Sequence, residues 1–278
     1  MIGFFDSGLG GLTILKEVLR HIPEYNYIYL GDQARNPYGN KSQELIYQYT
    51  KQGVDFLMKQ GCQIVIVACN TASAKALRRL QQEWLPENHP EKRVLGVIIP
   101  TAEGAVEVLE KEPQRKRSKK NKVGIIGTRA TIKSQTFEQE LKKLDPNLRI
   151  YTQATPLLVP LAEEGWFKRP ETRKIIRYYL KPLKQVRVNV LILGCTHYPV
   201  LYRTISEVMG RQCQIIDPPS LVAEKLKDYL DRHPELEKKL KQNKNRVFYT
   251  TDNPAKFKEL GSKFLKQNIK QVKFSELN

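Results

Sequence analysis

Cysteine is scarce in this chain, and that scarcity excludes several classes of protein. Its 278 residues hold four cysteines, at positions 62, 69, 195 and 213, with no C-x-x-C pair. Zinc sites and disulfide frameworks need closer or denser cysteine spacing. The amino terminus also lacks the basic stretch before an apolar run that marks a signal peptide. We therefore expect a cytoplasmic protein without a structural metal site.

Long hydrophobic runs and the familiar cofactor motifs are missing as well. Apolar runs reach only about five to eight residues, too short to cross a bilayer, so we expect no membrane partner. The glycine-rich turn 6–12 lacks the G-x-G-x-x-G spacing of dinucleotide sites. Walker A, HExxH, GxSxG and EF-hand patterns do not occur either. We expect a reaction that needs no cofactor.

Acidic residues are too few to balance the basic ones. Lys and Arg number 47 against 29 Asp and Glu, a net charge of +18. Such a surplus is typical of nucleic-acid partners. Much of it is local, in the segment KEPQRKRSKKNK at 111–122, which we interpret as an exposed loop between domains. Because no aromatic residues are interleaved with these basic ones, we place nucleic-acid binding second, as a polyanion-binding alternative.

Short β-branched runs alternate with longer amphipathic stretches, a pattern that predicts βαβ units and a largely parallel sheet. The expected strands are 2–5, 26–30, 64–68, 94–98, 123–126, 149–152, 190–193, 214–216 and 246–250. The expected helices are 13–21, 42–59, 72–84, 101–110, 132–144, 170–184, 202–209, 220–230 and 254–266.

A weak internal repeat indicates two related halves. The run at 2–8 resembles the run at 123–128, and each precedes by some sixty-odd residues a strand that ends in a cysteine. We predict a first α/β domain of residues 1–97 plus 209–278, and a second of residues 98–208. Ligands of open α/β sheets bind beyond the carboxyl ends of the strands, so both thiols would face one cleft.

Cys69 and Cys195 are the strongest candidates for chemistry. Each lies where a strand gives way to a helix, so backbone N–H groups can stabilise a thiolate. Matched thiols suit a proton-transfer enzyme with two opposed acid/base groups. Cys62 and Cys213 sit at strand beginnings, where an inert buried role is adequate.

Other polar residues near these strands have both structural and functional interpretations. His197 follows Cys195 by two residues and could assist protonation in the same cleft. A cysteine and a histidine could also form the nucleophile and base of a cysteine hydrolase. That alternative would leave Cys69 without a role. Asp6 could cap its turn, contact a substrate ammonium group or polarise a thiol. The segment around Tyr38 reads as a Pro-Gly turn.

Six motifs together resemble those of glutamate racemases, in the aspartate/glutamate racemase superfamily. They follow the order and spacing of that family across nearly the whole chain. They are DSGLGGL at 6–12, YLGDQARNPYGNKS at 29–42, ACNTASA at 68–74, VGIIGTRATIKS at 123–134, VPLAEEG at 159–165 and LGCTHYPVL at 193–201.

The resemblance implies two pseudosymmetric doubly wound α/β domains with mainly parallel sheets and an active site in the cleft between them. It implies cofactor-independent racemisation of glutamate by two cysteines, in a homodimer that supplies D-glutamate for peptidoglycan. A racemase for aspartate or another amino acid is the alternative within the superfamily.

The resemblance also implies a set of site residues. The catalytic positions it matches are Cys69, Cys195, Asp6, Glu163 and His197. The substrate-holding positions it matches are Asp6, Ser7, Pro37, Tyr38, Gly39, Asn70, Thr71, Thr196 and His197.

Overall fold

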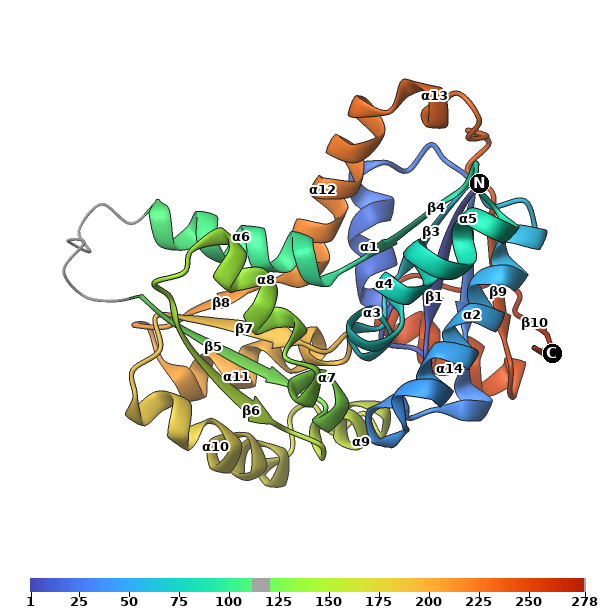
Figure 1. Cartoon of the computed structure of the whole chain (residues 1–278). Helices are drawn as coiled ribbons and strands as arrows, with labels where there is room; N and C mark the ends of the chain where they lie inside the picture. Colours follow the sequence, from blue (N-terminus) through green and yellow to red (C-terminus); the bar gives the residue numbers. More distant parts are fainter. Residues whose placement is uncertain (112–120, 278) are drawn as a thin grey trace. The chain divides into compact units, whose positions relative to one another are not determined.

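The chain divides into two compact units in this computed structural model, which describes residues 1–111 and 121–277 (Figure 1). Unit 1 comprises Met1–Val97 and Pro219–Asn278, and unit 2 comprises Ile98–Pro218. The sequence predicts that the second domain ends at residue 208. Residues 209–218 instead lie in unit 2, because strand β8 (Gln214–Ile216) pairs with β7 (Val190–Gly194) of that unit. Most of the predicted basic loop, 112–120, lies outside the described residues. The described residues on either side of it both belong to unit 2, so the expectation that this segment connects the two domains is wrong.

Unit 1 is built on a six-stranded sheet whose described pairings are all parallel, in the order β10-β9-β2-β1-β3-β4. The central strand β1 has all five residues buried, as expected for a strand covered on both faces. The strands are β1 (Ile2–Asp6), β2 (Tyr27–Gly31), β3 (Ile64–Val67), β4 (Arg93–Gly96), β9 (Arg246–Thr250) and β10 (Lys273–Phe274).

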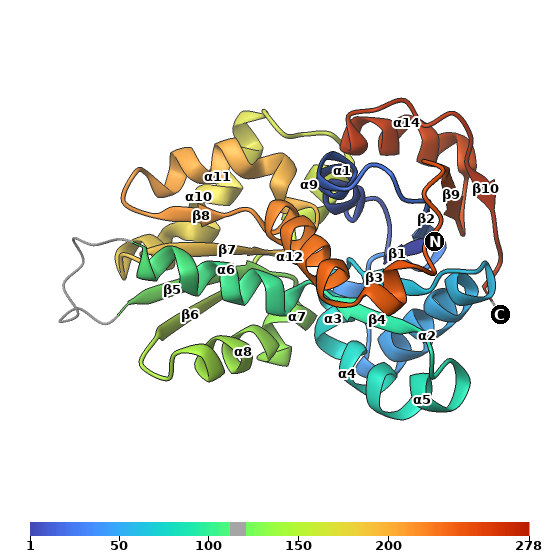
Figure 2. The same ribbon diagram turned by 90° about the horizontal axis from the view of Figure 1, so that it is seen from above.

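Helices cover both faces of this sheet. Helices α1 and α14 contact each other on one face, and α2 packs against β1 and β3 on the other (Figure 2). The helices of unit 1 are α1 (Leu12–His21), η1 (Gln33–Arg35), η2 (Tyr38–Asn40), α2 (Gln43–Lys59), α3 (Asn70–Lys75), α4 (Leu77–Arg79), η3 (Leu80–Trp84), α5 (Leu85–Asn88), α12 (Pro218–Arg232), α13 (Pro234–Glu237) and α14 (Pro254–Leu265).

Unit 2 holds a four-stranded parallel sheet in the order β6-β5-β7-β8. Helices α6 and α8 lie on one face of it, and α10 and α11 lie on the other (Figure 2). The other strands are β5 (Lys122–Gly127) and β6 (Arg149–Ala154), and the helices are α6 (Ile98–Glu110), α7 (Arg129–Ser134), α8 (Thr136–Leu144), α9 (Leu158–Glu163), α10 (Pro170–Gln185), η4 (Tyr198–Leu201) and α11 (Tyr202–Met209).

The two sheets share a common strand order. Strands β2-β1-β3-β4 of unit 1 follow one another as β6-β5-β7-β8 do in unit 2. The strand that begins each half of the sequence repeat, β1 or β5, is therefore flanked by the next two strands along the chain. The prediction of an α/β protein with mainly parallel sheets is confirmed.

Two of the predicted helices are wrong because each is broken in the structure. The helix expected at 72–84 is interrupted at Ala76, where φ is −119°. The helix expected at 132–144 breaks at Gln135, which has a left-handed φ of 57°. There the Ser134 hydroxyl donates to the carbonyl of Thr131 and accepts from the amide of Thr136, competing with the helical pattern.

Two shorter features also differ from expectation. The strand predicted at 94–98 ends at Gly96, and Ile98 already begins α6. The short helices α9 and α13 were not expected, because four to six residues hold too few turns for a helical periodicity to show.

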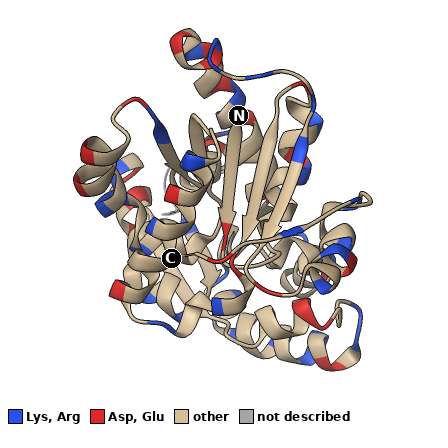
Figure 3. Ribbon diagram, turned by 90° about the vertical axis from the view of Figure 1, so that its right-hand side faces the viewer, with Lys and Arg blue, Asp and Glu red and all other residues tan. Residues whose placement is uncertain are grey.

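Charged residues lie mainly on helices and loops, while the sheets carry few of them (Figure 3). Several basic residues pair with acids one helical turn away, as Arg203 does with Glu207. Within the described part of the chain, no helix combines the length and apolarity that a bilayer crossing requires.

Candidate functional site

Cys69 lies two residues beyond the end of strand β3, which neighbours the central strand β1 of the unit 1 sheet. Its side chain is buried, and its Sγ donates to the hydroxyl oxygen of Ser7 at 3.4 Å. Ser7 follows β1, so the two carboxyl strand ends bring together residues 62 positions apart in sequence. The structure therefore gathers the predicted Ser7 and Cys69 at one point.

Asp6 ends strand β1 and is fully buried. Its Oδ2 accepts from the backbone amide of Gly8 at 2.9 Å, so the capping role considered from the sequence is real. The first turn of α1 packs tightly here. A Cβ on Gly11 would lie 2.8 Å from the Asp6 Cβ and 2.9 Å from the Ala68 Cβ, so only glycine fits.

Asn70 and Thr71 follow Cys69 in the first turn of α3, and both are buried. The Asn70 Oδ1 is a buried acceptor without a hydrogen-bond partner among the described protein groups. A buried polar atom without a partner is costly, and such atoms cluster where a protein binds something else. This oxygen can accept from an ammonium group of a small ligand.

Tyr29 is a residue that the sequence analysis did not single out. It is fully buried on β2, and its hydroxyl donates to the carbonyl of Gly8 at 2.9 Å. Burial raises the pKa of Tyr29 well above the ordinary value, and the charges of Asp6 and Cys69 raise it further. Tyr29 therefore remains a neutral donor that fixes the glycine-rich turn beside both groups.

The segment after β2 carries the predicted Pro37, Tyr38 and Gly39. Tyr38 and Gly39 are buried in η2, whereas Pro37 is exposed. The Tyr38 hydroxyl donates to the carboxylate of Asp32, which is itself fully buried. A hydrogen bond to a buried carboxylate is not expected of a plain surface turn, so the interpretation of this segment as a Pro-Gly turn alone is incomplete.

In unit 2, Cys195 follows strand β7 as Cys69 follows β3. Its Sγ lies 3.8 Å from Nδ1 of His197, and Nε2 of His197 lies 3.1 Å from Oε1 of Glu163. Glu163 ends α9 and is partly exposed, while His197 is buried. The structure thus joins three predicted residues in one chain of contacts.

The histidine in this chain of contacts favours its protonated form. Burial opposes the charge, but hydrogen bonds to Cys195 and Glu163, together with their negative charge, outweigh it and raise the pKa of His197 to about 10. An imidazolium next to a sulfur atom stabilises a thiolate. His197 therefore presents a cationic side chain to the sulfur of Cys195.

A second tyrosine supports the Cys195 turn. Tyr198 is fully buried, and its hydroxyl lies 2.6 Å from Oγ1 of Thr155, the residue that follows β6. Both were missed from the sequence, because a tyrosine and a threonine 43 positions apart give no signal until the strand order is known. Thr196, between the cysteine and His197, is buried as expected for a contact residue.

The structure thus gathers the predicted residues in two groups, each at the carboxyl ends of its own sheet. The unit 1 group is Asp6, Ser7, Pro37, Tyr38, Gly39, Cys69, Asn70 and Thr71. The unit 2 group is Glu163, Cys195, Thr196 and His197. Among residues 1–111 and 121–277, no cluster of three His, Cys, Asp or Glu has the arrangement of a metal site.

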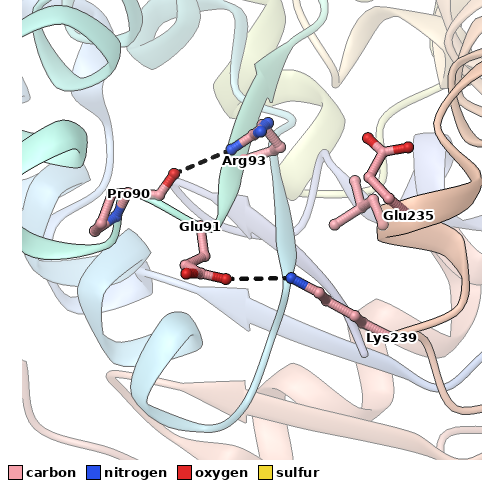
Figure 4. A pocket seen from close by; sticks show the side chains of 6 residues that line it. Pro90, Glu91, Arg93, Glu235 and Lys239 are labelled. Carbon is pink, nitrogen blue, oxygen red and sulfur yellow. Dashed lines mark hydrogen bonds and ion pairs between the residues drawn. The ribbon is translucent and has the colours of Figure 1, made fainter.

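A pocket of about 280 Å³ lies elsewhere in unit 1, near the amino end of β4 (Figure 4). It is lined by Pro90, Glu91, Arg93, Glu235, Leu236 and Lys239. Glu91 and Lys239 pair at 3.2 Å, and Arg93 donates to the carbonyl of Pro90. Because the pocket lies at the amino end of β4, whereas the residues gathered above lie at the carboxyl ends of the strands, it is not part of the candidate site.

Known proteins resemble this chain over almost its full length. The model of the Asp/Glu/Hydantoin racemase family matches residues 12–226. A glutamate racemase of Geobacter metallireducens is 40% identical over 265 residues, which cover 95% of this chain and 92% of the relative. One from Chlorobaculum parvum is 38% identical over 98% of this chain and 94% of its own.

Solved structures agree. Glutamate racemase isoform RacE1 of Bacillus anthracis superposes with a TM-score of 0.87 at 33% identity, covering 100% of this chain and 97% of its own. The glutamate racemase of Francisella tularensis, solved in complex with D-glutamate, superposes with a TM-score of 0.86 at 32% identity and the same coverage.

Proposed function

Because the chain belongs to the Asp/Glu/Hydantoin racemase family, we propose that it interconverts L- and D-glutamate with two cysteines and no cofactor. The observation that carries this proposal is the equivalent position of Cys69 and Cys195. Each follows the strand beside the central strand of its sheet, and each has a polar side chain against its sulfur. The similarity to a racemase solved with D-glutamate supports the substrate.

In the proposed reaction, one cysteine acts as a thiolate and the other as a thiol. The thiolate removes the proton from Cα, whose electron pair passes into the α-carboxylate. The other thiol then donates its proton to the opposite face of Cα, so that one C–H bond breaks and one forms. We assign Cys69 as the base toward D-glutamate and Cys195 as the base toward L-glutamate, as in the family that the motifs resemble.

The neighbouring residues would support this exchange. Asp6 would assist on the Cys69 side, and Glu163 with His197 on the Cys195 side, where an imidazolium stabilises the thiolate. The unpaired Asn70 oxygen would accept from the substrate ammonium group. The remaining substrate contacts that we propose are Ser7, Pro37, Tyr38, Gly39, Thr71, Thr196 and His197.

We also infer the setting of this reaction from the family relationship. The enzyme would act in the cytoplasm as a homodimer and supply D-glutamate for peptidoglycan synthesis. Its positive net charge would favour the approach of a substrate that carries two carboxylates.

Proton exchange at Cα tests the proposal directly. Each glutamate enantiomer is incubated with the enzyme in D₂O without added cofactor, and deuterium at Cα is followed by NMR together with the ratio of enantiomers. We expect exchange with interconversion in the wild type, and loss of interconversion in both Cys69→Ser and Cys195→Ser. Cys213→Ser, which changes a buried thiol outside both groups, is the control and should retain activity.

Other results would replace the proposal with a named alternative. Exchange on aspartate but not glutamate would retain the mechanism and change the substrate. Loss of activity with Cys195→Ser but not with Cys69→Ser would favour a single-cysteine reaction. Absence of exchange with any amino acid would contradict the proposal and leave the basic surface, with salt-sensitive polyanion binding, as the leading explanation.

A further inference from the structure

Asp32 is a buried carboxylate that the proposed mechanism does not use. It follows strand β2, directly before η1, and its side chain has no exposed surface. A buried charge is costly unless it is paired and hydrogen-bonded. The groups that surround Asp32 therefore indicate its structural role.

Three side chains donate to this carboxylate from different segments. Nε of Arg35 donates to Oδ2 at 2.7 Å, and the hydroxyl of Tyr38 donates to the same oxygen. The hydroxyl of Thr251 donates to Oδ1 at 2.8 Å. Asp32 thus fixes the Tyr38 side chain of its own loop to a residue more than two hundred positions later in the sequence.

Thr251 holds the same loop at a second point. Its Oγ1 also accepts from the backbone amide of Ala34 at 3.0 Å, within η1. Thr251 directly follows strand β9, which pairs with β2 along Tyr27–Gly31. The end of β9 therefore supports the start of the loop through one hydroxyl group that bonds to both Asp32 and Ala34.

The position of the Tyr38 ring depends on these hydrogen bonds as well as on its packing. The ring lies against Phe5 of the central strand and against Tyr49 of α2, with centroids 6.3 and 5.9 Å away. Aromatic contacts alone leave a ring some freedom to shift, whereas a charge-assisted hydrogen bond fixes its tip. The position of Gly39, next in the chain, depends on the same anchor.

We propose that Asp32 and Thr251 are positioning residues that hold the loop of Pro37, Tyr38 and Gly39 in its substrate-binding position. The proposal rests on the function proposed above, since it assumes that this loop contacts glutamate. Neither residue touches the reacting atoms in this account. Their effect is on substrate binding, carried from the end of β9 through the Asp32 carboxylate to Tyr38.

Thr251→Val provides the main test, because it removes the bridging hydroxyl and nearly preserves the volume. We expect KM for both enantiomers to rise about 10-fold, equivalent to about 1.4 kcal/mol, a loss typical of a buried hydrogen bond left without its partner. We expect kcat to change by less than about threefold, since the loop binds ground state and transition state alike. Thr251→Ser retains the hydroxyl and should restore the KM of the wild type.

Thr250→Val is the matched control. Thr250 is the neighbouring buried threonine, and its hydroxyl donates to the Gln33 side chain instead of Asp32. We expect this variant to keep the KM of the wild type. The midpoint of urea unfolding, measured for all variants, separates a general loss of stability, which reduces the active fraction and hence kcat, from a change in KM.

A double-mutant cycle tests the route through Asp32. If Thr251 acts through Asp32 on Tyr38, then Thr251→Val should raise KM much less in a Tyr38→Phe background, where the anchored hydroxyl is already gone. Additive effects of the two substitutions would contradict this route.

The two proposals fail in different ways. Absence of glutamate interconversion by the wild type would overturn the proposed function. An active wild type together with an unchanged KM in Thr251→Val, or an equal rise in KM in Thr250→Val or Thr251→Ser, would overturn the positioning role alone.

Discussion

At the scale of single residues, Asn70 shows how an unpaired atom can identify a binding group. Its Oδ1 is buried and has no partner among the described residues, so the protein alone leaves its hydrogen-bonding capacity unused. If the oxygen accepts from the substrate ammonium group, binding recovers that cost.

We therefore expect Asn70→Ala to weaken substrate binding more than it weakens the fold. KM for glutamate should rise about 10-fold, the effect of one lost hydrogen bond to a charged group. The free energy of unfolding should stay within about 1 kcal/mol of the wild type, because the lost packing is offset by removal of an unpaired acceptor. Steady-state kinetics and urea unfolding measure the two effects, and an unchanged KM would contradict the assignment.

His197 gives a prediction about pH. Its folded pKa of about 10 lies above the value of 6.5 that it has when unfolded, so the folded state binds this proton more tightly. Its contribution to stability is fully present below about pH 6.5 and is lost as pH rises toward 10.

In urea unfolding at a series of pH values, the difference in unfolding free energy between wild type and His197→Gln should shrink from pH 6.5 to 10. The slope of that difference should not exceed about 1.4 kcal/mol per pH unit, the limit for one proton. Glu163→Gln removes one of the two groups that raise this pKa, so its profile should fall at lower pH. A pH-independent difference would show that His197 does not carry this proton.

Residues with reactive or ionisable side chains in short motifs were easier to predict than the residues that hold them in place. The thiols, His197 and Asp6 follow strands in short motifs, so their places at the strand ends could be read from the sequence. Tyr29, Asp32, Thr155 and Thr251 were missed because their partners lie in other segments. Only the strand order shows that such residues meet.

At the scale of elements, the loop after β2 and the turn after β1 meet at a point where glycine is required. A Cβ on Gly31 would lie 2.5 Å from the carbonyl oxygen of Gly8 and 2.7 Å from the Phe257 ring. The carbonyl belongs to the backbone, so it cannot swing away as a flexible side chain would.

Gly31→Ala should accordingly destabilise unit 1 by about 1–3 kcal/mol, the range for overpacking. Gly8→Ala is the matched control in the same turn, because its nearest contact to a new Cβ would be an ordinary 3.6 Å from Asn36. Chemical denaturation of both variants compares them. Equal midpoints for the two would mean that the close approach of Gly31 to Gly8 is relaxed at little cost.

The central elements were predicted well because their signals are local. Apolar runs such as IVIV at 64–67 mark a buried parallel strand, and amphipathic runs such as 170–185 mark a helix. The broken helices were not predicted, since the apolar periodicity continues across the break at Gln135. There two hydrogen bonds of the Ser134 hydroxyl, rather than the periodicity, determine the backbone conformation.

At the scale of the whole molecule, unit 1 is discontinuous in sequence while unit 2 is continuous. Strand β9 pairs with β2 along its length, and α14 packs against α1. Unit 1 therefore cannot be completed by residues 1–97 alone.

A chain shortened to residues 1–245 should lose the protection of unit 1 but keep that of unit 2. Hydrogen exchange of β1 and β2 amides should approach the rate of an unfolded chain, while amides of β5 and β7 remain protected. A chain ending at residue 271, which lacks only the short exposed edge strand β10, is the control and should resemble the wild type. Protected β1 amides in the 1–245 chain would contradict this dependence.

The bond between Thr251 and Asp32 also has a consequence for the newborn protein. Strand β2 leaves the ribosome long before β9, and at about 5–20 residues per second the interval is on the order of 10–40 s. Throughout that time the Asp32 carboxylate exists without one of its donors. The Tyr38 loop of a nascent chain can therefore acquire its final shape only as synthesis ends.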